Sequence, residues 1–339
     1  MKLEDHLSEI SSPAERTFMG ELEFRFPRLK QLVGWERNER YYWVEDGHVK
    51  NLYLSYIDLS NETPDLIEEI LKYLPKLKHL GLAECNLSKN LTLLKELGKL
   101  EELKRLESLS LSKNALKEIP FSFDKLKNLK DLDLDQNKLS ALPKSLSELD
   151  LLEGLSLYEN YFTKFPEVVL KCNSLTGLSF THNSLTDIPD KISNLSEIGG
   201  LSFGDNKIKI LPDSISKLKN LTHFHIDHNK LESLPEFLGD LVNLEEAVFR
   251  ENRIESIPES IGNLKKLKYL DLSHNQIREI PESMGDMDSL KTLIIDYNKI
   301  EKIPDSFHDL KNLKALQIIQ GNPIANIPER LKKNIRFLD

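Results

Sequence analysis

The stretch LKDLDLDQNKLSALP, residues 129–143, decides the fold because it is one copy of a pattern that recurs along the chain. Residues 267–281, LKYLDLSHNQIREIP, keep the same spacing of leucine, asparagine and proline. The asparagine returns every 23 residues, at Asn114, Asn137, Asn160, Asn183, Asn206, Asn229, Asn252, Asn275 and Asn298. A proline follows each asparagine by six residues, and apolar residues precede each asparagine by eight, five and three residues. A fixed period of this length is typical of solenoids, in which each repeat stacks on its neighbours.

Each part of the repeat favours a different local structure. The apolar–polar alternation before the asparagine predicts a short β-strand, with leucines turned inward and the intervening residues outward. The inward asparagine can bind backbone groups through its side-chain amide where the chain leaves the strand. The proline fixes φ and lacks an N–H donor, which favours an irregular segment on the other side of the repeat. One repeat cannot bury its own leucines, so the pattern predicts a stack.

The repeat unit LxxLxLxxNxLxxIPxxLxxLxx resembles the leucine-rich repeat, and its 23-residue form is similar to the intracellular repeats of Ras-binding scaffold and Ras-suppressor type proteins. The resemblance implies an α/β solenoid, a leucine-rich-repeat horseshoe with a concave parallel β-sheet. Ile57 and Cys85 take the asparagine place in two earlier copies, and the steps of 28 and 29 residues there predict helical segments. A last copy carries Pro328, which gives about twelve repeats.

Both ends of such a stack need a cap. We expect residues 1–48 to form an N-terminal cap with a helix and a β-hairpin. The helix is predicted to start at the capping box Ser12-Pro13-Ala14-Glu15, and the hairpin to turn at Glu45-Asp46-Gly47. Residues 49–328 then hold the leucine-rich repeats, and residues 329–339 are predicted to form a C-terminal cap.

The composition narrows the class of partner and compartment. The formal net charge of −9 argues against nucleic acid or an anionic membrane as the main partner, because both require a basic surface. The N-terminus has no apolar segment typical of a signal peptide, and the two cysteines are too few for a disulfide framework. We therefore expect a monomeric cytoplasmic protein that binds another protein.

The outward strand residues stand one, two, four and six positions before each asparagine and are the candidates for partner binding. In the nine regular copies ten of these residues are acidic, five are histidines and only two, Lys113 and Arg250, are basic. This bias predicts a basic protein partner. The candidate binding residues are Asp131, Asp133, Asp135, Gly154, Ser156, Tyr158, Gly177, Ser179, His182, Gly200, Ser202, Asp205, His223, His225, Asp227, Glu246, Arg250 and Asp271.

Three successive strands begin with Gly-Leu-Ser and place small residues side by side. Gly154, Gly177 and Gly200 form one row, and Ser156, Ser179 and Ser202 form the next. Since neighbouring strands lie about 4.8 Å apart, these residues would make a trough on the concave face. We expect a partner to dock there, although weak selection on an unused face would also leave small residues.

Two motifs suggest chemistry, and neither has the context that the chemistry needs. His223, His225 and Glu246 are sufficient ligands for zinc or iron(II), yet no enclosing pocket is indicated and every repeat carries outward polar residues. Residues 200–204, GLSFG, match the hydrolase motif GxSxG but lie inside a strand instead of at a strand-to-helix turn. We therefore expect no metal, no cofactor and no enzymatic activity.

The resemblance implies a signalling or regulatory adaptor, with a small GTPase or a kinase as the kind of partner. Three alternatives stay open: a sensor or inhibitor module of a larger complex, a self-associating structural protein, and a metal-dependent binder or enzyme that uses His223, His225 and Glu246. Charge reversal at Asp131, Asp133 and Asp135 is expected to weaken partner binding and to leave the fold intact.

Overall fold

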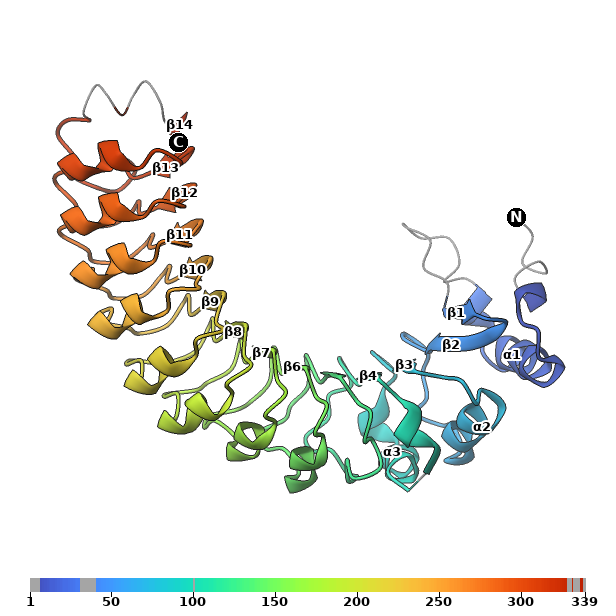
Figure 1. The fold of residues 1–339 in the computed structure, drawn as a ribbon. Helices are drawn as coiled ribbons and strands as arrows, with labels where there is room; N and C mark the ends of the chain where they lie inside the picture. Colours follow the sequence, from blue (N-terminus) through green and yellow to red (C-terminus); the bar gives the residue numbers. More distant parts are fainter. Residues whose placement is uncertain (1–6, 31–40, 100, 328–330, 332–335, 338–339) are drawn as a thin grey trace. The chain divides into compact units, whose positions relative to one another are not determined.

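The computed structural model describes residues 7–30, 41–99, 101–327, 331 and 336–337. The chain divides into two compact units, Met1–Tyr161 and Phe162–Asp339. Each unit is a stack in which every repeat adds one short strand to a sheet, and helical or extended segments return the chain to the next strand (Figure 1). The α/β solenoid predicted from the repeat is confirmed.

The first unit begins with a helix that starts where the sequence indicates. Helix α1, Pro13–Arg25, has Ser12 as its N-cap, and the Ser12 side chain accepts a hydrogen bond from the Glu15 backbone N–H. The buried Glu15 carboxylate does not return to Ser12, as a capping box would require. It accepts a hydrogen bond from the Val49 N–H at 3.0 Å and lies 2.6 Å from His48 Nδ1, so it joins α1 to the strand that follows.

The predicted hairpin is also confirmed. Strands β1, Tyr42–Glu45, and β2, His48–Tyr53, pair antiparallel. The two turn residues, Asp46 and Gly47, have φ values of 52° and 74°, which suits a tight two-residue turn. Strand β2 then pairs in parallel with β3, His79–Gly81, and so begins the parallel sheet of this unit.

The longer steps near the start of the chain contain the α-helices that their length predicts. Helix α2, Asp65–Tyr73, buries Leu66, Ile67, Ile70 and Leu71 on one face, and helix α3 spans Leu91–Leu97. The other elements of the first unit are η2 Leu7–Glu9, η3 Pro27–Lys30, η4 Leu87–Lys89, η5 Glu101–Arg105, β4 Ser108–Ser110, β5 Asp131–Asp133, η6 Lys144–Glu148 and β6 Gly154–Ser156. Its strands follow one another in chain order.

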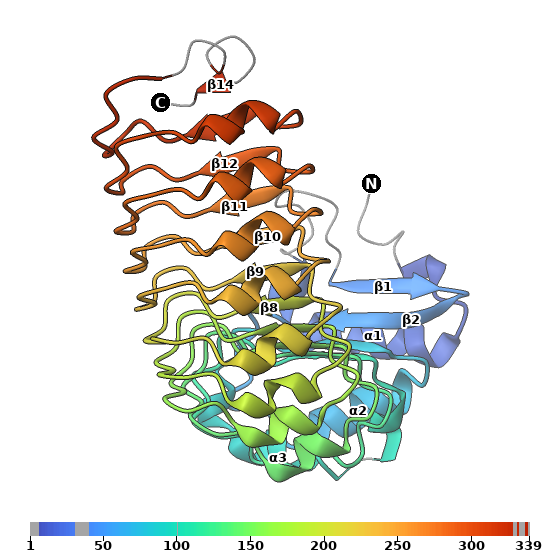
Figure 2. The same cartoon turned by 60° about the vertical axis from the view of Figure 1, so that its left-hand side comes forward.

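The second unit is the more regular of the two, and Figure 2 shows its strands and single-turn helices alternating from repeat to repeat. Each 3₁₀ helix from η7 to η13 directly follows the proline of its repeat, where the sequence predicted only an irregular segment. Proline holds φ near −65°, which suits the residue that enters such a turn. The elements are η7 Glu167–Lys171, β7 Gly177–Ser179, η8 Asp190–Asn194, β8 Gly200–Ser202, η9 Asp213–Lys217, β9 His223–His225, η10 Glu236–Asp240, β10 Glu246–Val248, η11 Glu259–Asn263, β11 Tyr269–Asp271, η12 Glu282–Asp286, β12 Thr292–Ile294, η13 Asp305–Asp309, β13 Ala315–Gln317 and β14 Arg336–Phe337.

The repeated asparagines connect consecutive repeats through hydrogen bonds to the backbone. The Asn206 amide nitrogen donates to the carbonyls of Phe180, Phe203 and Gly204, and its Oδ1 accepts from the Leu185 N–H. The same contacts recur at other copies, and eight of the nine asparagines are buried, while Asn183 is half-buried. In the places where asparagine is replaced, Ile57 and Cys85 are buried as well.

The predicted C-terminal cap, residues 329–339, lies largely outside the described residues. Leu331 is buried, and β14 pairs in parallel with β13. Among the helices in the described part of the chain, none combines the length and the apolar character needed to cross a membrane.

Candidate interaction surface

The alternation of the strands separates the core from the outward residues, which form what is called here the sheet face of each unit. In the first unit Leu132 and Leu134 are buried, whereas Asp131 is exposed and Asp133 is half-buried. In the second unit Phe224 and Ile226 are buried, whereas His223 is exposed and His225 is half-buried. The predicted inward and outward positions are thus observed on both sheets.

A second feature of the repeat was not predicted from the sequence. The residue directly before each repeated asparagine has left-handed backbone, with φ between 50° and 56°: Lys113, Gln136, Glu159, His182, Asp205, His228, Glu251, His274 and Tyr297. These side chains leave the end of their strand at one edge of the sheet face. In the second unit they alternate between imidazole and carboxylate from His182 to His274. The residue types at this position do not by themselves indicate a left-handed backbone. Their fixed place directly before the asparagine is the sequence signal that could have revealed this row.

The acidic group of the first unit is only partly available to a partner. Asp131 is exposed, and its Oδ1 would lie 2.7 Å from a Cβ added at Gly154, so the carboxylate leans over this glycine on β6. Asp133 instead accepts hydrogen bonds from Ser110 Oγ at 2.6 Å and from the Asp135 N–H at 3.0 Å. Its contacts belong to the framework of the sheet.

Asp135 also accepts a hydrogen bond within the framework of the sheet. Its Oδ1 accepts the Tyr158 N–H at 2.8 Å, and burial raises the pKa of its carboxyl above the usual value. The expectation that charge reversal at Asp131, Asp133 and Asp135 leaves the fold intact therefore needs correction. It is reasonable for Asp131 alone, because reversal at the other two would break hydrogen bonds within the sheet.

The small-residue trough is found in the second unit at four of its predicted residues. Strands β7 and β8 place Gly177 beside Gly200 and Ser179 beside Ser202. A Cβ added at either glycine would meet no atom within 4 Å, so this part of the sheet face is an open floor. Gly154 and Ser156, the other two trough residues, lie on β6 of the first unit.

The histidines of β9 border this floor but do not converge on one point. The register places His223 beside Gly200 and Glu246, as expected. The Glu246 carboxylate nevertheless contacts His225, at 2.9 Å from Nε2, and His223 Nδ1 lies 2.9 Å from Thr222 Oγ1. His223, His225 and Glu246 therefore do not form the metal-ligand group considered as an alternative.

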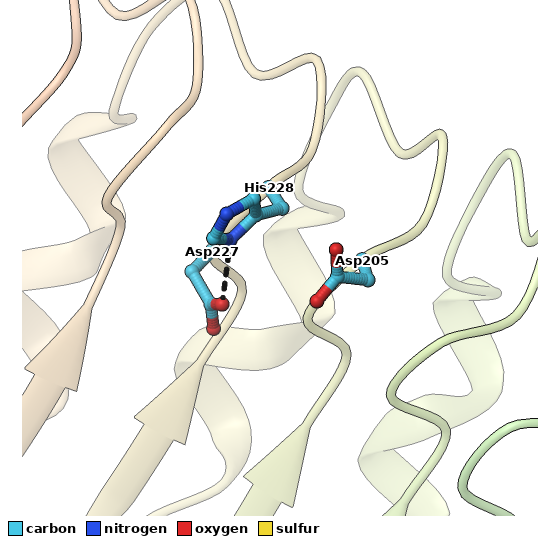
Figure 3. Close-up of side chains that lie close together, drawn as sticks. All are labelled: Asp205, Asp227 and His228. Atoms are coloured by element: carbon cyan, nitrogen blue, oxygen red, sulfur yellow. Dashed lines mark hydrogen bonds and ion pairs between the residues drawn. The ribbon is translucent and has the colours of Figure 1, made fainter.

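A different group of potential ligands is assembled beyond the ends of β8 and β9. Asp205, Asp227 and His228 bring one ligand atom each to within 4.8 Å of one another (Figure 3). Within this group His228 Nδ1 lies 3.0 Å from Asp227 Oδ2. On the side of β10, His228 Nε2 lies 2.9 Å from Glu251 Oε2.

Arg250 and Glu251, which follow β10, pair with each other, and Asp271 at the end of β11 is buried. Arg250 donates to Glu251 at 2.7 Å, and this hydrogen bond lowers the pKa of the Glu251 carboxyl. Asp271 was expected to face outward and to be available to a partner, but its residue is only 6% exposed. Its Oδ1 accepts hydrogen bonds from the Ser273 N–H and Oγ, so the carboxylate is used to close the end of its own strand.

The GLSFG segment has none of the geometry of a hydrolase nucleophile. Gly200 and Ser202 lie on β8, with Ser202 beside His225 in the register. The N–H groups of Gly200 and Phe203 donate to the carbonyls of Thr176 and His225 in the neighbouring strands. They are therefore committed to the sheet and not free to form an oxyanion hole.

Three models of leucine-rich repeat families match the chain. A model described as leucine-rich repeat region matches residues 250–335. One described as two copies of leucine-rich repeats matches residues 104–150, and one described as leucine-rich repeat matches residues 173–231. The matched segments lie in both units of the structure.

Solved structures with the same architecture come from several kinds of organism. A leucine-rich repeat protein of Leptospira interrogans is 28% identical with a TM-score of 0.67, over 86% of this chain and 83% of that chain. A plant peptide hormone receptor, solved in complex with its peptide, is 26% identical with a TM-score of 0.67; the match covers 89% of this chain and 48% of the receptor. An internalin of Listeria monocytogenes has a TM-score of 0.68 over 93% of this chain and 96% of that chain, and its 19% identity supports the fold alone.

The search of curated proteins gave no match. The assignment to a family therefore rests on the repeat, the family models and the solved structures. The 23-residue period, the asparagine ladder and the one-strand repeats agree with the family models that match both units. Together they show that this chain is a leucine-rich repeat protein.

Proposed function

We propose that this protein is a recognition module that binds a basic protein partner on its sheet face, in intracellular signalling or regulation. The observation that carries the proposal is the open floor at Gly177 and Gly200, where an added Cβ would meet no atom within 4 Å. A flat area of backbone and small side chains lets a partner approach closely. The surrounding polar residues can then fix its orientation.

The charge of the outward residues on each unit supports a basic partner. Asp131 and Glu159 are exposed on the first unit, and Glu246 and Glu251 are half-exposed on the second. Complementary charge contributes more to the rate and specificity of association than to the final affinity. We therefore expect binding to weaken as the salt concentration rises.

The relatives support recognition without naming a partner. The plant receptor binds a peptide hormone, and it shares the repeat architecture with this chain. The 23-residue repeat is similar to that of Ras-binding scaffold proteins, so a small GTPase or a kinase is the class of partner that we propose. The candidate residues listed from the sequence remain the proposed contact set, with Asp133, Asp135 and Asp271 removed because of their framework contacts.

The test is affinity capture from a lysate of the source organism, with Gly177→Trp compared with wild type. The indole would fill the open floor, and the fold should tolerate it because nothing lies within 4 Å of the added Cβ. Lys191→Trp is the matched control, since Lys191 is exposed on η8, outside the sheet. We expect a captured protein to be lost with Gly177→Trp and retained with the control.

Retention of the same protein by both variants at equal melting temperature would show that the floor is not the docking place. A second arm repeats the capture of wild type at several salt concentrations. Binding that does not change with salt would contradict the proposed charge complementarity.

A further inference from the structure

Asp205, Asp227 and His228 form a group of possible metal ligands in the second unit. Asp205 follows strand β8, and the other two follow β9, one repeat later. Figure 3 shows the Asp205 carboxylate directed toward the pair formed by Asp227 and His228. One oxygen from each carboxylate and one imidazole nitrogen all lie within 4.8 Å of one another.

The donor types match a particular class of ion. An imidazole with two carboxylates suits zinc, whereas calcium and magnesium favour sites built from oxygen atoms alone. Ligands around tetrahedral zinc stand about 3.4 Å apart, because each lies about 2.1 Å from the metal. The three ligand atoms lie within 4.8 Å of one another, and they can reach the zinc spacing by rotation of their half-exposed side chains.

His182 lies beside this group, on the neighbouring repeat, and contacts Asp205. Its Nε2 lies 3.3 Å from Asp205 Oδ2, on the side of Asp205 that faces away from β9. His182, Asp205 and His228 share the left-handed position before the asparagine, which directs all three from the same edge of the sheet. The group itself offers one imidazole and two carboxylates, which leaves the fourth position of a tetrahedral ion to water.

A contact outside the group orients the histidine. His228 Nε2 faces the Glu251 carboxylate at 2.9 Å, and Glu251 is held in turn by Arg250 at 2.7 Å. A carboxylate on the far nitrogen is the arrangement that turns the near nitrogen of a metal-binding histidine toward its ion. Here the near nitrogen is Nδ1, which points at Asp227.

A glycine makes room for the second carboxylate. Gly204 stands two places before its asparagine, where the other eight regular copies carry Ser112, Asp135, Tyr158, Thr181, Asp227, Arg250, Ser273 and Asp296. A Cβ at Gly204 would lie 2.8 Å from Asp227 Oδ1, closer than such atoms approach. The missing side chain therefore lets Asp227 lean from its own repeat toward Asp205.

We propose that Asp205, Asp227 and His228 bind one zinc ion at the edge of the sheet face, with water in the fourth position. Zinc takes the place of any proton on His228 Nδ1, and that proton is released to solvent. The two carboxylates balance the charge of the ion, and the ion would tie together two consecutive repeats of the second unit. This site shares Asp205 and Asp227 with the proposed partner contact set, but zinc binding is measured without a partner, so either proposal can fail while the other stands. It uses none of the three residues considered for metal binding from the sequence.

The test is calorimetric titration of the metal-free full chain with zinc chloride, together with metal analysis after dialysis. We expect one equivalent of zinc in wild type and loss of that equivalent in Asp227→Asn, which keeps the size of the side chain. Gly204→Ala should weaken zinc binding at least tenfold without changing any ligand. Glu251→Gln should weaken it by roughly 10–100-fold, the usual effect of losing an outer carboxylate.

His223→Asn is the matched control, because His223 is an exposed histidine of the same strand region outside the group. It should bind zinc as wild type does, and the melting temperature of each metal-free variant shows whether it is folded. Several weak equivalents that persist in Asp227→Asn would mean adventitious surface binding only and would overturn the proposal. No heat and no retained zinc in wild type would overturn it as well.

Discussion

Asn206 forms four hydrogen bonds with backbone groups of its own repeat and the one before it, and no apolar side chain can replace them. Asn206→Leu would leave the Leu185 N–H and up to three carbonyls without this partner. We expect a loss of unfolding free energy of at least about 1–3 kcal/mol, the usual cost of a buried unpaired group. Urea unfolding followed by circular dichroism measures it. Lys209→Leu, at an exposed position nearby, is the control, and equal midpoints for both variants would refute the structural role of the ladder.

The carboxyl of Asp135 leads to a prediction, also at the scale of one residue, about how stability depends on pH. Burial raises the pKa of its carboxyl in the folded protein, so folding favours the protonated form. The cost of the buried charge is therefore absent below the ordinary aspartate pKa, grows as pH rises through the raised pKa, and is complete above it. Asp135→Asn keeps an acceptor for the Tyr158 N–H without the charge.

We expect Asp135→Asn to melt at or above the wild-type temperature at pH 7 and to lose that advantage at about pH 3.5, below the ordinary aspartate pKa. Asp135→Ala loses the acceptor and should melt lower than wild type at both pH values. Thermal melts at the two pH values separate charge from hydrogen bonding. A lower melting temperature for Asp135→Asn than for wild type at pH 7 would show that the charge itself stabilises the fold.

Residue patterns predicted which side chains face outward, but not which of these side chains are already hydrogen-bonded within the protein. Alternation in the strand fixes direction, so the outward direction of Asp131 and His223 could be foreseen. The hydrogen bonds of Asp133 and Asp271 depend on short serine side chains that happen to lie within reach. The proposed zinc ligands were not recognised as a group because Asp205 and Asp227 lie past the ends of their strands, 22 positions apart, whereas the group considered from the sequence used strand residues: His223, His225 and Glu246.

At the scale of elements, step length predicted α2 and α3, and turn residues predicted the β1–β2 hairpin. The 3₁₀ helices were not predicted, since a single turn after proline leaves no periodic pattern in so few residues. Their packing is nevertheless specific. In η10, η11 and η12 a glycine faces the serine of the next helix, and a Cβ on Gly262 would lie 2.4 Å from the Ser283 carbonyl oxygen.

Gly262→Ala should therefore destabilise the second unit. The obstructing atom belongs to the backbone, so the helices must move apart, at a cost of about 1–3 kcal/mol, typical of overpacking. Gly177→Ala is the matched control, because its Cβ would meet no atom within 4 Å and alanine restricts the unfolded chain. Chemical unfolding of the two variants gives the comparison. Equal stability would indicate that the contact between η11 and η12 is loose.

At the scale of the whole molecule, a stack of equivalent repeats should tolerate the loss of one complete repeat but not of part of one. Deletion of residues 276–298 removes one 23-residue copy from the second unit and joins Asn275 to Lys299. Asn275 Oδ1 would keep the hydrogen bond that it accepts from the Ile254 N–H, and the Ile300 N–H would keep its bond to Asn322 Oδ1. On the helical side, Gly262 would face Ser306 just as Gly285 does now.

We expect the shortened protein to unfold cooperatively, at a lower temperature than wild type because one interface between repeats is lost. Deletion of residues 276–287 is the matched control. It removes only the return segment that contains η12, so the chain can no longer pass back from the end of β11 to the start of β12. Calorimetry and circular dichroism should show a native-like transition for the first deletion and none for the second. If the whole-repeat deletion failed to fold, each repeat of this unit would be specific to its place, and stability would not arise from equivalent neighbouring contacts.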